Sequence, residues 1–188
     1  MVGGGKLVAA TKAASTRGGK IVSESNFKLQ EQDGRADFDF FIGSWKFQNR
    51  CLREWLKGST SWEEFGGTSV SHKILGGLGH VEEFTLERAS GATEGLVVRL
   101  FDPQTQQWSV NEADNRNGFN SRPPIGVFKD GRVEGYSHEP WEGKYIFRRV
   151  IWSEITATSF HWEQAFSADG GKTWETNWIA DFARRTKL

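Results

Sequence analysis

Three side chains in the second half of the sequence could do proton-transfer or anion chemistry. Glu112 and Asp114 lie on an alternating run with Trp108 and Val110, so the four side chains share one face of an expected strand. A carboxyl group that an indole shields from water has a raised pKa and can act as a general acid or base. Arg148 shares a face with apolar neighbours, and a buried guanidinium needs an anionic partner or an anionic ligand.

Each of these side chains also has a structural interpretation. The opposite register would turn Glu112 to solvent, and a buried Arg–Glu pair would occupy both Glu112 and Arg148. Arg149 follows directly, so one of the two arginines points inward, and alternation alone leaves open which one. In an enzyme, Glu112 or Asp114 would move protons while Arg148 stabilised an enolate-like anion.

Aromatic side chains at every second position predict either a filled core or the lining of a pocket. Trp162 and Gln164 share a face of one expected strand, and Trp174 shares a face with Trp178 and the small Ala180 on the next. Small residues between large ones leave space, so we expect Trp162 and Trp178 to bound a cavity in which Gln164 offers a polar contact. The candidate ligand-binding residues are Trp45, Asn49, His72, Trp108, Arg148, Trp162, Gln164 and Trp178.

Metal and cofactor motifs are missing from the sequence. The histidines have no metal-site spacing, and Cys51 is the single cysteine. His72 lies between Val70 and Ile74 on one face and is the histidine expected to point inward, which keeps haem ligation as a less favoured alternative to a core histidine. The sequence has no nucleophile elbow, phosphate loop or dinucleotide fingerprint. We therefore expect no metal and no cofactor.

Composition restricts the partners and the compartment. Lys and Arg together number 24, as do Asp and Glu, so neither nucleic acid nor an anionic membrane is an expected partner. The lone cysteine fits a reducing compartment. The start has only a short apolar run, and nowhere are there 18 consecutive apolar residues. These features favour a cytoplasmic protein.

From Trp45 onward, alternating runs are separated by turn signals such as Asp102-Pro103 and Asp130-Gly131, which predicts about ten antiparallel strands. Gly66-Gly67 is interpreted as a break between two strands. The polar loop over 115–124 is long enough to be a lid, with Phe119 as its cap, or a plain surface loop. The expected strands cover 45–55, 61–65, 68–75, 80–88, 94–101, 108–114, 125–129, 133–138, 144–152, 159–166 and 174–182, and a short polar helix is expected over 53–57.

Two segments of different composition make up the chain. Residues 1–36 form an arm rich in small and polar residues, with a possible short helix over 6–15, and residues 37–188 form the barrel domain. The arm and three aromatics expected at the surface, Trp55, Phe65 and Trp141, predict a homodimer. Sedimentation as a monomer at all concentrations would refute that prediction.

Three stretches together carry a family resemblance: Phe38–Trp45, Gly67–Gly77 and Phe166–Trp174. In that order they resemble a group of mostly uncharacterised bacterial proteins with a calycin-like barrel, the fold of lipocalins and fatty-acid-binding proteins. The resemblance implies an all-β, single, up-and-down antiparallel barrel whose cavity holds a small hydrophobic molecule or a haem, and such scaffolds also serve as cyclases and isomerases. The segment Ser167–Trp174 matches a single Asp-box, a turn motif that is structural in the repeats of sialidases.

An open sandwich is the competing architecture. The leading functional hypothesis is a barrel that holds a small, largely apolar ligand in a central cavity. The alternative is a cyclase, isomerase or dehydratase that needs no cofactor and acts on a small hydrophobic substrate in the same cavity. A strongly raised pKa of an inward carboxyl group would favour the enzyme.

Overall fold

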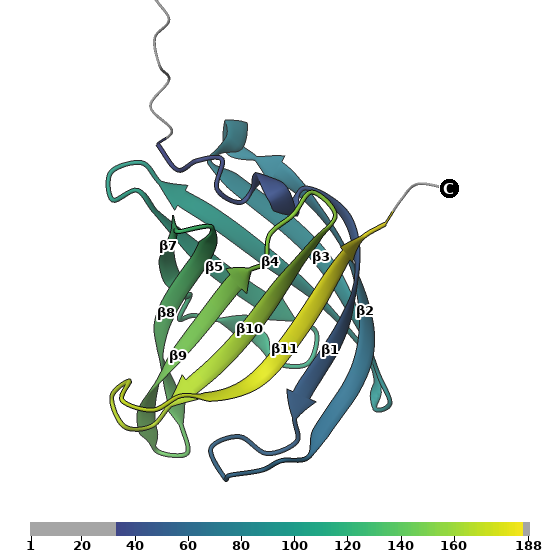
Figure 1. Cartoon of the computed structure of the whole chain (residues 1–188), viewed down its shortest axis with the longest axis vertical. Helices are drawn as coiled ribbons and strands as arrows, with labels where there is room; N and C mark the ends of the chain where they lie inside the picture. Colours follow the sequence, from purple (N-terminus) through teal and green to yellow (C-terminus); the bar gives the residue numbers. More distant parts are fainter. Residues whose placement is uncertain (1–32, 186–188) are drawn as a thin grey trace, which may run out of the picture. The chain divides into compact units, whose positions relative to one another are not determined.

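A computed structural model describes residues 33–185, and these form one closed antiparallel barrel with an extra short strand (Figure 1). The predicted helix over 6–15 lies outside the described residues, as does most of the predicted arm. The strands are β1 (Gly43–Leu52), β2 (Trp62–Ile74), β3 (Gly79–Arg88), β4 (Gly91–Asp102), β5 (Gln107–Asp114), β6 (Gly118–Asn120), β7 (Ile125–Lys129), β8 (Arg132–Trp141), β9 (Lys144–Ser153), β10 (Ser159–Ser167) and β11 (Glu175–Arg184).

Hydrogen bonding between strands runs in an unbroken circuit. Neighbours in sequence pair from β1 to β5 and from β7 to β11, β5 pairs with β7, and β11 returns to β1. Trp45 lies opposite Arg184 and Cys51 opposite Trp178 in the closing pair. The strand β6 pairs with β5 alone. The predicted barrel of about ten strands, closed by the Trp45 strand and a C-terminal strand, is confirmed, and the open sandwich is wrong.

Two predictions about local structure are wrong. The segment over 53–57 forms bends, with no helix. The strand β2 continues through Gly66 and Gly67, where a break was expected. At Gly67 an added Cβ would lie 2.4 Å from a ring carbon of Phe47 on the neighbouring strand. This glycine therefore allows an aromatic ring to pack against the backbone of the strand, and it does not end the strand.

The turn between β10 and β11 is built by the Asp-box residues. The Asp169 carboxylate accepts hydrogen bonds from the backbone N–H groups of Lys172 and Thr173, both at 3.0 Å, and from the Thr173 hydroxyl at 2.7 Å. The Thr173 bonds, followed by one from Ser167, hold the pKa of Asp169 well below its usual range. The motif is therefore structural here, as expected.

One end of the barrel is filled with aromatic side chains. A single 3-10 turn, η1 (Asp39–Phe41), crosses that end, at the top of Figure 1. The Trp45 indole donates to the Phe41 carbonyl at 2.7 Å, and the Trp108 indole donates to the Gly34 carbonyl at 3.0 Å. We call this cluster the aromatic plug; its fully or nearly fully buried members are Phe38, Phe41, Trp45, Trp108, Trp152 and Phe160. No helix among residues 33–185 is long and apolar enough to cross a membrane.

Replacing Gly67 by alanine is expected to destabilise the barrel by about 1–3 kcal/mol, because the methyl group would overlap the Phe47 ring. Thermal or urea unfolding measures the loss. The matched control is Gly66→Ala, where the nearest atom is the flexible end of Glu87 at 3.2 Å. Equal losses in both variants would show that the Phe47 contact is not what requires glycine.

Candidate ligand-binding cavity

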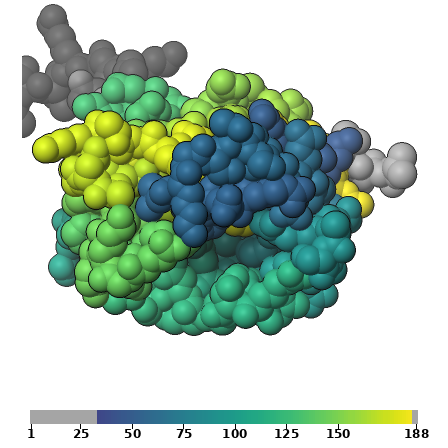
Figure 2. Space-filling model, turned by 90° about the horizontal axis from the view of Figure 1, so that it is seen from below, coloured from purple at the N-terminus to yellow at the C-terminus, as the bar shows by residue number. Residues whose placement is uncertain are grey.

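Below the aromatic plug the barrel is hollow. The cavity measures about 700 Å³, within the range of small-molecule sites. Figure 2 looks at the end opposite η1 and shows the surface hollowed between the β1–β2 loop, in blue, and the teal and green strands. The side chains that line it come from nearly every strand of the circuit, and they include Phe47, Asn49, Trp55, Glu82, Phe84, Arg99, Glu112, Phe119, Glu139, Trp141, Arg148, Trp162, Gln164, Phe166, Trp178, Ala180 and Phe182.

Two indoles form one wall of the cavity. The rings of Trp162 and Trp178 meet edge to face, with centroids 5.8 Å apart. Trp178 donates its N–H to the Asn49 side-chain oxygen at 2.9 Å, and Asn49 donates in turn to the Phe65 carbonyl at 3.2 Å. Ala180 lies opposite Trp162 in the strand register and lines the cavity with a small side chain. The polar edge of Trp178 is therefore satisfied by protein, and its apolar surface is available to a ligand.

A β-bulge in β11 decides which residues share this wall. Gln164 pairs with Trp178 but the next residue, Ala165, pairs with Thr176, so Asn177 is the extra residue. The expectation that Trp174 shares the face of Trp178 is wrong, because the bulge shifts the alternation. The Trp174 ring lies outside the barrel, 4.7 Å from the Arg149 guanidinium.

Arg148 points inward, and its charge is already compensated. It donates two parallel hydrogen bonds to the Glu112 carboxylate, both at 2.8 Å, and a third to the Gln164 side-chain oxygen at 2.7 Å. Burial opposes the charged form, but Glu112 and then Glu139, 3.7 Å away, outweigh it and raise the pKa of Arg148. The structural interpretation of the Arg–Glu pair is therefore the one the structure shows. Arg149 points outward to Glu163 at 3.5 Å.

The second acidic candidate, Asp114, caps a turn. Its carboxylate accepts hydrogen bonds from the backbone N–H groups of Arg116 and Asn117, at 2.8 and 2.6 Å. Burial alone would raise the pKa of Asp114, but the hydrogen bonds from Asn117 and Arg116 outweigh it, so the pKa is lowered. This direction is opposite to the one that a general acid at neutral pH needs.

Three of the candidate residues lie away from the cavity. Trp45 and Trp108 belong to the aromatic plug, where their rings are packed on all sides. The expectation that His72 points inward is wrong, because β2 turns Ser69 and Ser71 to the interior and leaves His72 exposed. The side chains lining the cavity include no histidine, cysteine, methionine or tyrosine, so the described residues supply none of the usual axial ligands of a haem. Among residues 33–185 no three His, Cys, Asp or Glu side chains are grouped to hold a metal ion.

The inner end of the cavity holds an ion pair that sequence analysis missed. Arg99 and Glu82 line this end, with the Arg99 Nη2 donating to Glu82 at 2.6 Å. The guanidinium lies 4.0 Å from the ring centre of Phe41 in the aromatic plug. The sequence did contain a pattern that predicts an inward Arg99, because Arg99 alternates with Val97 and Phe101 as Arg148 does with its apolar neighbours.

Aromatic side chains also surround the mouth. Trp55, from the β1–β2 loop, stacks on Trp141 with ring centres 5.6 Å apart, and both touch Phe166. Phe119 lies on β6 at the rim, lines the cavity and is 67% exposed. Phe119 is the one aromatic residue of the 115–124 segment, and it lies at the opening of the cavity, where a lid would have to lie.

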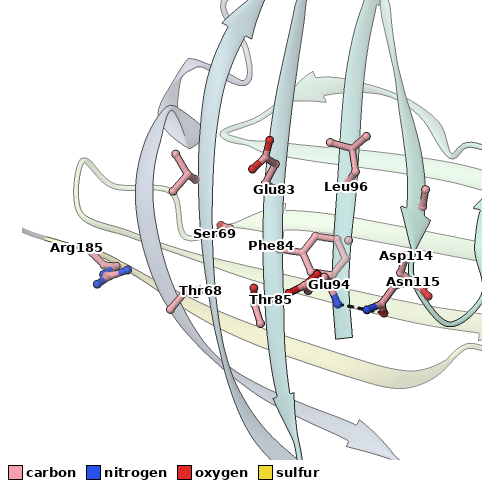
Figure 3. Close-up of a pocket in the computed structure, with 13 residues that line it drawn as sticks. Thr68, Ser69, Glu83, Phe84, Thr85, Glu94, Leu96, Asp114, Asn115 and Arg185 are labelled. Carbon is pink, nitrogen blue, oxygen red and sulfur yellow. Dashed lines mark hydrogen bonds between the residues drawn. The ribbon is translucent and has the colours of Figure 1, made fainter. Parts of the chain in front are cut away.

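A second hollow lies on the outer surface of β2 to β5 (Figure 3). Thr68, Thr85 and the carboxylates of Glu83 and Glu94 line it, with Arg185 at one side. The Asn115 side chain accepts a hydrogen bond from the Glu94 backbone at 3.2 Å, which ties the β5–β6 turn to β4. Polar and apolar side chains both line this hollow, and Phe84 lines it as well as the cavity.

The closed circuit and the interior hollow define a calycin-like barrel. No family model and no curated protein sequence matches the chain. Among solved structures, the chain is similar to the S-type phycobiliprotein lyase CPES from Guillardia theta, with a TM-score of 0.55 and 10% sequence identity over 86% of this chain and 99% of that chain. At this identity the likeness shows the fold, and it agrees with the barrel that the sequence predicted.

A buried histidine that packs against Trp108 is expected to make the stability of the barrel depend on pH. His80 is fully buried, and its burial, followed by the charge of Arg99, lowers its pKa from 6.5 to about 4. Between these two pH values the unfolded chain binds a proton at His80 and the folded barrel does not. The contribution of His80 to the free energy of unfolding is therefore fully present above pH 6.5 and is lost as the pH falls towards 4. The expected loss is roughly 2–3 kcal/mol over that window.

Urea unfolding at pH 7 and pH 4.5 measures this effect. The variant His80→Gln is expected to lose most of the pH-dependent difference, whereas His72→Gln, which removes an exposed histidine, is expected to keep it. A pH dependence that persists unchanged in His80→Gln would assign it to other groups.

Proposed function

We propose that this protein binds a small, largely apolar molecule inside the barrel. The observation that carries the proposal is the cavity of about 700 Å³, whose walls are mostly aromatic and whose mouth is ringed by Trp55, Trp141 and Phe119. Aromatic walls favour flat apolar ligands, and a few fixed polar groups orient them. The similar fold of a phycobiliprotein lyase supports the use of such a barrel for a small molecule. At 10% identity it does not identify the ligand of this chain.

The state of the polar groups favours a binding protein over an enzyme. Glu112 and Arg148 occupy each other through two hydrogen bonds, so neither is free to move a proton or to stabilise an enolate. Asp114 is held ionised by its turn. A cyclase, isomerase or dehydratase would have to use other residues.

Tryptophan fluorescence tests the proposal with an uncharged apolar probe, N-phenylnaphthylamine. Binding in the cavity is expected to quench Trp162 and Trp178 by energy transfer, so Trp178→Phe should reduce the quenching while far-ultraviolet circular dichroism stays unchanged. The matched control is Trp174→Phe, outside the barrel and against Arg149. Quenching that Trp174→Phe reduces as much as Trp178→Phe, or no probe binding by the wild type, would contradict binding in the cavity.

Self-association remains a separate proposal. Phe65 no longer supports it, because its side chain is only 4% exposed, and Trp55 and Trp141 stack on each other. Apolar side chains do lie exposed along β7 and β8, among them Ile125, Val127, Phe128 and Tyr136. We keep the homodimer as a prediction for sedimentation to test.

A further inference from the structure

The two ion pairs inside the cavity differ in how completely their guanidinium groups are bonded. Arg148 uses Nε, Nη1 and Nη2 as donors. Arg99 is only 2% exposed, yet it donates through Nη2 alone, and its Nε and Nη1 have no hydrogen-bond partner among the described residues. Buried N–H groups of this kind are rare in folded proteins, and an unpaired one at a cavity signals a missing partner.

The neighbouring side chains do not supply that partner. Ser71 lies opposite Glu82 and His80 opposite Arg99 in the strand register, and the buried polar atoms of these two side chains also have no hydrogen-bond partner among residues 33–185. The missing partner of Arg99 has to be a hydrogen-bond acceptor, since a guanidinium only donates.

The charges around the cavity decide what kind of acceptor fits. Four carboxylates line it, from Glu82, Glu112, Asp114 and Glu139, against the two guanidiniums of Arg99 and Arg148. The lining is therefore negative overall, and Glu82 already neutralises Arg99. A ligand carboxylate would be repelled, whereas an uncharged acceptor would gain the hydrogen bonds without that cost.

We infer that the cavity takes an apolar ligand that carries a carbonyl group at its leading end, where Arg99 donates to the carbonyl oxygen. This inference rests on the proposed function. It narrows the expected class of ligand to aromatic ketones, amides or lactams and excludes anions that resemble fatty acids. The ligand body then lies against the wall formed by Trp162 and Trp178, and its other end faces the mouth.

Three probes of nearly equal shape test the inference: acetylnaphthalene with a carbonyl, ethylnaphthalene without a polar atom, and naphthoate with a charge. Each displaces N-phenylnaphthylamine in competition, which gives their relative affinities. The preference for acetylnaphthalene over ethylnaphthalene is expected to fall about tenfold in Arg99→Met/Glu82→Leu, which removes the guanidinium donors and leaves neither an unpaired carboxylate nor a new N–H donor.

The matched control is Arg148→Met/Glu112→Leu, which removes the other ion pair of the cavity and adds no N–H donor. Its guanidinium is fully bonded, so the preference is expected to stay near the wild-type value. An equal fall in both variants, no fall in either, or tighter binding of naphthoate than of acetylnaphthalene would overturn the inference while apolar binding survived. Absence of all binding would overturn both the inference and the proposed function.

If the Arg99 variant does not fold, a measurement on the wild-type protein tests the same hydrogen bond. Isotope-edited infrared spectroscopy of bound acetylnaphthalene, labelled at its carbonyl carbon, reports hydrogen bonding directly. The stretch is expected at a lower frequency than in an apolar solvent, as donation from a guanidinium weakens the carbonyl bond. A stretch at the apolar-solvent frequency would show that Arg99 has no ligand contact and that its free N–H groups have another role.

Discussion

Pairing of the first strand with the last is the constraint on which the rest of the structure depends. Once β11 returns to β1, each strand of the circuit has a partner on both sides, and the short β6 is the strand of residues 33–185 that is paired on one side alone. Alternation then sends every second side chain into a space of fixed width. The aromatic plug fills one end of that space. The other end, which the small Ala180 lines, is hollow.

Charged groups inside such a space are tolerated only when they are compensated, and the two ion pairs show two degrees of compensation. Glu112, Arg148 and Gln164 form a chain that Asn177 continues, with Gln164 donating to it at 3.0 Å. The extra residue of the β-bulge therefore completes the bonding of a buried arginine two strands away. The pair at the inner end has no comparable chain: Arg99 makes one hydrogen bond to Glu82 and lies against the Phe41 ring.

Sequence patterns predicted the barrel, nearly all its strands and the inward faces of regular strands, because period-two alternation reports directly on burial. Trp162, Gln164 and Trp178 were placed on the cavity wall by that rule, whereas for Glu112 the rule left two registers open. It failed where the backbone departs from regularity: the bulge moved Trp174 outward, and Gly67 read as a break. It also could not separate the lining of the cavity from the filled end, since Trp45 and Trp108 alternate just as Trp162 does. That distinction is made by η1, whose residues enter the barrel from outside the alternating strands.

The order of the strands along the chain has a consequence for how the protein acquires its cavity. The closing contact joins residues near Trp45 to residues near Arg184, so it cannot form until almost all of the barrel sequence has left the ribosome. Contacts between such distant residues are slow to form, because the loop between them must first lose its entropy. Until then the aromatic walls are exposed on an open, edge-bearing sheet. The cavity of the proposed function therefore exists only after the last strand has paired with the first.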